Sequence, residues 1–210
     1  MIRAIIFDLD NCLSAADEVG RGLLEPVFDA IRRANKGTLP GEALARAFED
    51  CWRHPLDWVA REYGFTGEML AAGWEVAART EVEAPMRGYP DLGALAELPA
   101  MLFLVTSGFR RLQDSKIRAL GFESLFKAIH VDALDEADRQ GKEGLFREIL
   151  KTYRLAPEEV LIVGDNPDSE IEAGNRLGMR TVQILRPGVP RGDNATHYIH
   201  SLAELKGLLT

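Results

Sequence analysis

The chain has 210 residues, 46% of them hydrophobic, enough for one sizeable domain or for one domain that carries a smaller insert. Its 25 basic and 33 acidic residues give a formal net charge of -8, which argues against a nucleic-acid partner. Cys12 and Cys51 are too few for a disulfide framework, so we expect buried, reduced thiols in a cytoplasmic protein. No apolar run approaches the roughly 18 residues of a membrane helix, so no membrane partner is expected.

The first predicted element is a short buried strand near the N-terminus. Ile5, Ile6 and Phe7 form an apolar run that leads into Asp8 and, two residues later, Asp10. Side chains in a strand alternate between its faces, so residues that are two apart point the same way. The sequence therefore places two carboxylates in one small space at the end of this strand.

Residues 14–84 follow this strand and carry a helical pattern throughout. Their apolar residues recur at helical spacing in about four segments, which are separated by proline and glycine positions. Pro26 lies within the first segment and leaves the start of that helix open. We predict that residues 14–84 form a small all-helical cap domain.

The stretch CWRHPLDW, in the middle of this insert, combines aromatic and basic residues. We expect Trp52 and Trp58 to pack in the core of the insert, because large aromatic side chains are usually well buried. The alternative is that Trp52, Arg53 and His54 line the pocket from above, and Arg53 is the residue of this stretch that we predict to contact an anionic substrate.

Strands and helices alternate through the second half of the chain. Near-continuous apolar runs predict four buried strands, at residues 101–105, 128–131, 160–163 and 181–184. Helical patterns follow the first three, and Ser201 with Glu204 is typical of the capping box of a closing helix. The alternation predicts an α/β fold, a Rossmann-like parallel sheet with helices on both faces, formed by residues 1–13 and 85–210.

Polar residues follow the predicted strands at the carboxyl ends, where parallel sheets bind ligands. Thr106, Ser107 and Gly108 come after the second strand and ahead of a helix, where hydroxyl groups, backbone N–H groups and the helix dipole bind anions. Lys142, in the polar loop DEADRQGKEG, supplies a point charge for the same purpose. Asp165 follows the strand before the last one. We expect these groups to converge at one edge of the sheet.

The gathered acids at this edge predict a bound metal ion. Carboxylates at close range raise each other's pKa, because each charge disfavours the other. A hard divalent cation with oxygen ligands removes this difficulty, and magnesium typically takes one or two carboxylates and keeps its other positions for water and substrate phosphate. The predicted cofactor is therefore Mg²⁺.

Four motifs, in this order, resemble those of the haloacid dehalogenase-like hydrolases. DLDNCL resembles the first motif, LVTSG the second and LIVGDNPDSEIEAG the fourth, while Lys142 suits the third. The resemblance covers roughly residues 3–13 and 88–185, and the predicted helical insert lies where this family has a cap. It implies a phosphatase with a Rossmann-like core and a helical cap between the first and second motifs.

The resemblance also implies a role for each residue that matches a motif. Asp8 would be the nucleophile that forms an aspartyl-phosphate, and Asp10 would be the general acid and base. Mg²⁺ would be held by the carboxylates of Asp8 and Asp165 and by the backbone carbonyl of Asp10. Thr106 and Lys142 would bind the remaining phosphoryl oxygens of a small phosphorylated metabolite and stabilise the transition state.

The chain departs from the family pattern at four positions, one of which is Glu143, where proline usually follows the lysine of the third motif. Glu170 stands where a second aspartate is usual; we predict that it supports the metal through a bound water, with Asp168 as the alternative. Asn11 and Cys12 stand where glycine and threonine are common. Asparagine tolerates backbone angles that glycine adopts, so we expect the turn after the first strand to be retained.

Two other functions stay open at the level of sequence. A haloacid dehalogenase would use Asp8 to break a carbon–halogen bond, but that chemistry needs neither a metal nor the acid Asp10. A noncatalytic phosphoaspartate switch or Mg²⁺-binding module would also gather acids at this edge. Such a module has no use for a capping insert or for Asp10, both of which serve turnover.

Overall fold

The computed structural model describes residues 1–209; Thr210, the last residue of the predicted core range, lies outside the described residues. Six strands, all parallel, form one sheet in the order β3-β2-β1-β4-β5-β6. The strands are β1 (Ala4–Phe7), β2 (Met101–Gly108), β3 (Ala128–Ala133), β4 (Val160–Gly164), β5 (Arg180–Ile184) and β6 (His197–Ile199). The predicted Rossmann-like parallel sheet is confirmed.

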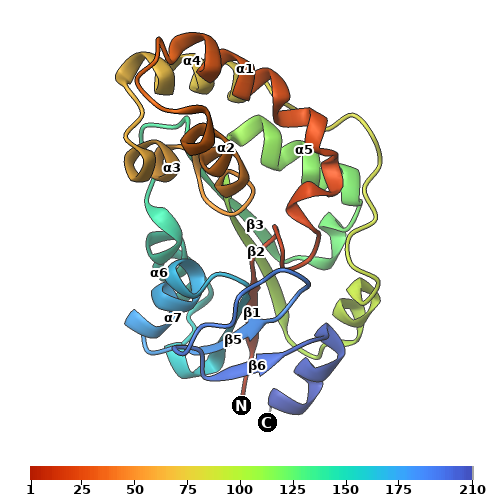
Figure 1. Ribbon diagram of the computed structural model, residues 1–210. Helices are drawn as coiled ribbons and strands as arrows, with labels where there is room; N and C mark the ends of the chain where they lie inside the picture. The colour runs from red at the N-terminus through yellow and green to blue at the C-terminus, as the bar shows by residue number, and fades with distance from the viewer. Residues whose placement is uncertain (210) are drawn as a thin grey trace.

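Helices cover the sheet and lie above its carboxyl edge (Figure 1). The α-helices are α1 (Glu25–Ala34), α2 (Gly41–Asp50), α3 (Leu56–Tyr63), α4 (Gly67–Ala77), α5 (Arg110–Leu120), α6 (Gly141–Tyr153) and α7 (Glu172–Arg176). The 3₁₀ helices are η1 (Ala16–Val19), η2 (Arg21–Leu24), η3 (Leu92–Glu97), η4 (Glu123–Leu125), η5 (Pro157–Glu159) and η7 (Leu202–Leu208), and η6 (Pro167–Ile171) is a π-helical turn. Within residues 1–209, no helix has the length and apolar character needed to cross a bilayer.

Both faces of the sheet are buried, which explains why the central strands β1, β2 and β4 carry continuous apolar runs. Ile5 and Phe7 of β1 belong to the hydrophobic cluster that also contains residues of η3, α5 and η7. Ile6, which points the opposite way, belongs to a second cluster with residues of α6 and α7. The helices on both faces that the sequence predicted are therefore present.

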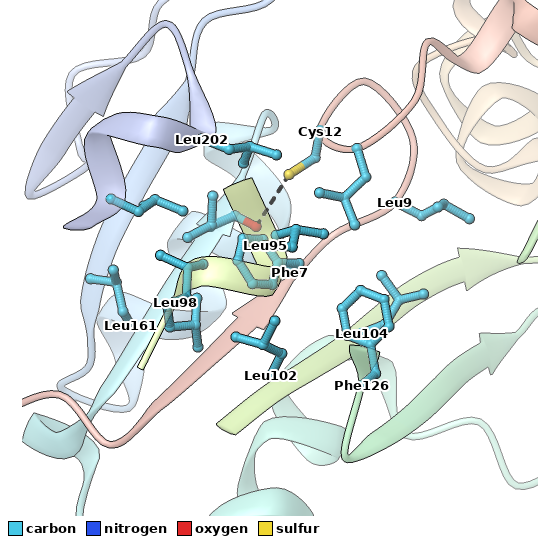
Figure 2. Packing of buried hydrophobic residues seen from close by; sticks show 14 of the residues in the cluster. Phe7, Leu9, Cys12, Leu95, Leu98, Leu102, Leu104, Phe126, Leu161 and Leu202 are labelled. Carbon is cyan, nitrogen blue, oxygen red and sulfur yellow. Dashed lines mark hydrogen bonds between the residues drawn. The ribbon is translucent and has the colours of Figure 1, made fainter. Parts of the chain in front are cut away.

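Cys12 belongs to the first of these clusters and is fully buried. Its thiol points away from the carboxyl edge and donates to the backbone carbonyl of Val163, with 3.6 Å between sulfur and oxygen (Figure 2). Burial raises the pKa of this thiol well above its usual range. The prediction of a buried thiol is confirmed for Cys12, whereas Cys51 is only partly buried, so for Cys51 it is wrong.

Helices α1 to α4 form a cluster of their own above the carboxyl ends of the strands (Figure 1). We call these four helices, with the turns that connect them, the helical insert. The rings of Phe28 and Phe48 stack inside it with their centroids 4.4 Å apart. Phe109 and Leu134, which follow β2 and β3, belong to the same hydrophobic cluster. The helical insert therefore rests directly on the edge of the sheet where the predicted site residues lie.

Pro26 marks the start of α1. It lies in the first turn of this helix, where the missing N–H of proline has no intrahelical partner to lose. The preceding residues form two 3₁₀ turns instead of one long helix, separated by Gly20 with a φ of 84°. The first helix of the insert is accordingly shorter than its apolar pattern suggested.

Candidate active site

The helical insert and the carboxyl ends of the strands enclose a cavity of about 570 Å³. All residues that the sequence predicted for the site line this one cavity. They are Asp8, Asp10, Arg53, Thr106, Ser107, Gly108, Lys142, Asp165 and Glu170. The parallel topology accounts for this convergence, since the ends of β1, β2 and β4 meet at the same edge of the sheet.

Lys142 bridges two buried carboxylates at the bottom of the cavity. Its Nζ donates to Asp8 Oδ1 and to Glu170 Oε2, each at 2.7 Å. Burial acts to lower the pKa of Lys142, but attraction to the two carboxylates outweighs it and raises this pKa, so the ammonium stays charged. Lys142 is the second residue of α6 and not part of a loop, because the helix begins at Gly141, earlier than its apolar stripe indicated.

The single ammonium does not offset all the negative charge of this cluster. Burial raises the pKa of Asp8 to about 7, with Lys142 opposing the shift and the charge of Glu170 adding to it. Burial, followed by repulsion from Glu170 and Asp8, also raises the pKa of Asp165 well above its usual range. Both shifts have the direction expected for acids that lack a sufficient counter-charge.

The same acids form an oxygen-donor set that fits a divalent cation. Asp8, Asp165 and Glu170 each offer a carboxylate oxygen, and these oxygens lie within 4.8 Å of one another. Such a set suits a hard cation like Mg²⁺. Both oxygens of Glu170 already accept hydrogen bonds, from Lys142 and from the Asn166 N–H, each at 2.7 Å. The Asp165 carboxylate accepts none from residues 1–209, so its oxygens are available to a metal.

Glu170, and not Asp168, reaches this cluster. Glu170 is only 1% exposed, whereas Asp168 is exposed to solvent. Gly164, the last residue of β4, provides the space that Glu170 occupies. A Cβ atom at position 164 would lie 2.2 Å from Glu170 Oε1, well inside a van der Waals contact. Of the two acids that the sequence left open, Glu170 is the one that lies in the cluster, in space that a glycine at the strand end provides.

Thr106, Ser107 and Gly108 are the last three residues of β2, which extends beyond its predicted end at residue 105. The helix α5 begins only at Arg110, so these residues do not form its first turn. Thr106 is 1% exposed, and its hydroxyl has no hydrogen-bond partner among residues 1–209. It therefore offers the cavity an unengaged hydroxyl.

Asp132, at the end of β3, is a site residue that was not predicted from the sequence. Its buried carboxylate accepts hydrogen bonds from the Ser107 hydroxyl at 3.1 Å, Arg139 Nε at 2.9 Å and the Gly141 N–H at 2.9 Å. It ties the end of β2 to the first turn of α6, which carries Lys142. The sequence feature that could have identified Asp132 is its place directly after the apolar run at residues 128–131.

The Asp10 carboxylate is turned toward α5. It accepts hydrogen bonds from Lys116 Nζ at 2.8 and 3.0 Å and from Gln113 Nε2 at 3.0 Å. Neither Gln113 nor Lys116 could be identified from the sequence, because buried polar residues within an amphipathic helix give no periodic signal.

Asn11, next to Asp10, has a φ of 55°, in the left-handed region where asparagine is tolerated better than most residues. Its side-chain Oδ1 accepts a hydrogen bond from the Ala16 N–H at 3.1 Å, which closes the turn after β1. The prediction that the turn is retained with asparagine in place of glycine is confirmed.

The helical insert presents aromatic and basic side chains to the cavity. Trp52 and Trp58 are only partly buried and line the cavity, so the prediction that they pack in the core of the insert is wrong. The core of the insert is filled by other residues of its four helices. Trp58 stacks on His54, with the ring centroids 3.9 Å apart. Arg53 donates to the Gly188 carbonyl at 2.9 Å, and its charge acts to lower the pKa of Asp165.

A family model described as haloacid dehalogenase-like hydrolase matches residues 2–178, which include all four motifs. The chain belongs to the haloacid dehalogenase-like hydrolases. The family that the motifs resembled, and the prediction of a hydrolytic enzyme, are thereby confirmed.

Curated relatives of this hydrolase include enzymes named as phosphatases. It is 30% identical over 202 residues to a glyceraldehyde 3-phosphate phosphatase of Methanopyrus kandleri, covering 89% of this chain and 85% of the relative. It is 32% identical over 189 residues to a phosphoserine phosphatase of Thermus thermophilus, covering 83% of this chain and 70% of the relative.

Solved structures with the same fold include enzymes with different activities. A phosphatase of this family from Thermococcus onnurineus has a TM-score of 0.67 and 21% identity, with 99% of this chain and 98% of that chain covered. A 2-haloacid dehalogenase from Pseudomonas syringae pv. Tomato has a TM-score of 0.61 and 19% identity, with 100% and 98% covered. At this identity the likeness concerns the fold alone.

Proposed function

We propose that this hydrolase is a Mg²⁺-dependent phosphatase that acts on a small phosphorylated metabolite. The observation that carries the proposal is the buried cluster of Asp8, Asp165 and Glu170 around Lys142, with the acid Asp10 beside it. A phosphoryl group adds negative charge to a cluster already short of positive charge, so it requires a divalent cation to enter the site. The relatives named as phosphatases support the same reaction class.

The donor set suggests how the metal is held. Asp8 and Asp165 would bind Mg²⁺ directly, together with the backbone carbonyl of Asp10. Glu170, whose two oxygens already accept hydrogen bonds, would hold a metal-bound water. The bound ion would neutralise charge on the transferring phosphoryl group.

In the first half-reaction, a carboxylate oxygen of Asp8 forms a bond to phosphorus while the bond from phosphorus to the leaving oxygen breaks. Asp10 gives its proton to that leaving oxygen. In the second half-reaction, water attacks the phosphorus, Asp10 takes up a proton from this water, and the bond between phosphorus and Asp8 breaks to release phosphate. Lys142 and the Thr106 hydroxyl bind the remaining oxygens and stabilise their charge.

The helical insert would serve as a cap, with residues 14–84 as the cap domain and residues 1–13 and 85–210 as the catalytic core. An ion pair joins the two parts at the cavity, between Asp57 of α3 and Arg139, with nitrogen and oxygen 2.8 Å apart. A cap over the cavity keeps bulk water from the aspartyl-phosphate until the leaving group has departed.

A hydrolysis panel tests the proposal. We expect Mg²⁺-dependent phosphate release from at least one of glyceraldehyde 3-phosphate, phosphoserine, sugar phosphates and nucleotides, with no release in excess chelator. Halide release from a 2-haloacid that survives the chelator would instead favour the dehalogenase. An aspartyl-phosphate that persists for many minutes would favour the noncatalytic module.

Arg53 is the insert residue that we propose to contact an anionic group on the leaving side of the substrate. Its guanidinium forms no ion pair with residues 1–209 and hydrogen-bonds only to a neutral carbonyl. Arg53→Met is therefore expected to raise KM about tenfold, roughly 1.4 kcal/mol of binding, for substrates with a carboxylate on the leaving group. Steady-state kinetics on carboxylate and neutral substrates measure this, with Arg33→Met, an exposed arginine of α1, as the control. A change in KM of the same size for carboxylate and neutral substrates in Arg53→Met would contradict the assignment.

A further inference from the structure

Two buried polar side chains of α5 meet the Asp10 carboxylate. The Lys116 side chain is 7% exposed and its Nζ lies 2.8 and 3.0 Å from the two Asp10 oxygens. A buried ammonium is stable only with a partner, and Asp10 is the one carboxylate that pairs with Lys116 among residues 1–209. The lysine is therefore held to this acid and to no other.

Gln113, one turn earlier on α5, fixes the same carboxylate from a second direction. Its Nε2 donates to Asp10 Oδ2 at 3.0 Å and to the Ser107 carbonyl at 2.8 Å. Both neighbours are acceptors, so only the amide nitrogen can face them. Gly108 makes room for this side chain, since a Cβ there would lie 2.5 Å from Gln113 Nε2.

The turn that carries Asp10 does not hold its carboxylate by itself. Among residues 1–209, the hydrogen bonds to this carboxylate come only from Gln113 and Lys116. A carboxylate offers roughly four lone-pair positions, and these three bonds leave about one free. Asp10 also lines the cavity, so the orientation that these three bonds fix is the one in which this side chain faces a substrate there.

We propose that Lys116 and Gln113 are positioning residues that hold Asp10 in the orientation for proton transfer to the leaving oxygen, a role that rests on the proposed phosphatase function. A general acid acts only within hydrogen-bond reach of the atom that it protonates. Lys116 and Gln113 restrict the rotation of the Asp10 side chain and exchange no proton themselves. The proton still passes from Asp10 to the leaving oxygen as the bond to phosphorus breaks.

The test compares substrates that differ in their need for an acid. Alkyl phosphates have a poor leaving group that must be protonated, whereas p-nitrophenyl phosphate has a good one that need not be. Lys116→Met is expected to lower kcat/KM about 100-fold for an alkyl phosphate, a loss within the range that a general acid contributes. For p-nitrophenyl phosphate the same variant should lower kcat/KM less than about threefold. Lys116→Arg should restore most of the loss, and Arg118→Met, an exposed arginine of the same helix, should change neither value.

Two further variants separate positioning from a structural effect. In the Asp10→Asn background, Lys116→Met should lower kcat/KM no more than about twofold further, because the group that it orients is already lost. Gln113→Met, which leaves Lys116 in place, should give a smaller loss with the same substrate dependence. Circular dichroism checks that each variant folds.

An equal loss on both substrates, or a full loss from Lys116→Met in the Asp10→Asn background, would overturn the positioning role. Failure of the wild-type enzyme to release phosphate with Mg²⁺ from these substrates and from every member of the hydrolysis panel would instead overturn the proposed function.

Discussion

Asp8→Asn is expected to abolish phosphate release, with kcat reduced about 10⁴-fold or more. The amide cannot attack phosphorus, so the covalent intermediate does not form. The variant should fold, because it removes one negative charge from a buried cluster in which repulsion and burial already raise the pKa of Asp8 to about 7. The measurement is Mg²⁺-dependent phosphate release, together with acid-quench trapping of the phosphoenzyme.

Asp168→Asn is the matched control for this substitution. Asp168 is exposed and lies outside the cluster of Asp8, Asp165 and Glu170, so its loss should change kcat less than about twofold. Normal turnover by Asp8→Asn would show that another group is the nucleophile, whatever the behaviour of the control.

Mg²⁺ is expected to raise the melting temperature of the metal-free protein, and more at pH 8 than at pH 6. The ordinary pKa of Asp8 is 3.8 and its folded value is about 7, so the folded protein binds this proton more tightly than the unfolded chain does. As the pH rises from 6 to 8, Asp8 ionises in the folded state and the metal-free protein loses stability. Mg²⁺ binds the ionised form and offsets that loss. At a concentration 100-fold above Kd, binding stabilises by about 2.7 kcal/mol.

Thermal melts with and without Mg²⁺ at pH 6, 7 and 8 measure this effect. Asp165→Asn removes a proposed direct ligand and should abolish the Mg²⁺-dependent shift and phosphate release together. A shift that is the same at all three pH values, or that persists in Asp165→Asn, would contradict the proposed metal site.

The carboxyl edge of the sheet could be predicted from the sequence because polar residues follow the apolar runs directly, although β2 and β3 extend into those polar residues. Asp8 and Asp165 follow β1 and β4 directly, so the parallel sheet alone brings them together. The strand β6 was missed, since its three residues include His197 and Tyr198 and form no apolar run. A short strand at the edge of a sheet needs little of the apolar character that the central strands require.

The residues that orient the site could not be predicted in the same way. Lys116 and Asp10 are 106 positions apart, and their contact depends on which face of α5 meets the turn after β1. The placement of Trp52 and Trp58 likewise depends on how the helical insert sits over the sheet. Helical periodicity indicates which residues are apolar, but it does not distinguish the interior of the insert from the wall of a cavity.

Gly164 and Glu170 fit each other, because the Glu170 side chain fills the space that a side chain at position 164 would occupy. Glutamate is one methylene longer than aspartate, and the glycine at the end of β4 leaves room for this longer side chain. An alanine at position 164 would force the longer acid out of the cluster, and an aspartate at position 170 would leave the space beside the glycine empty. A substitution at either position would therefore disturb the fit with the other.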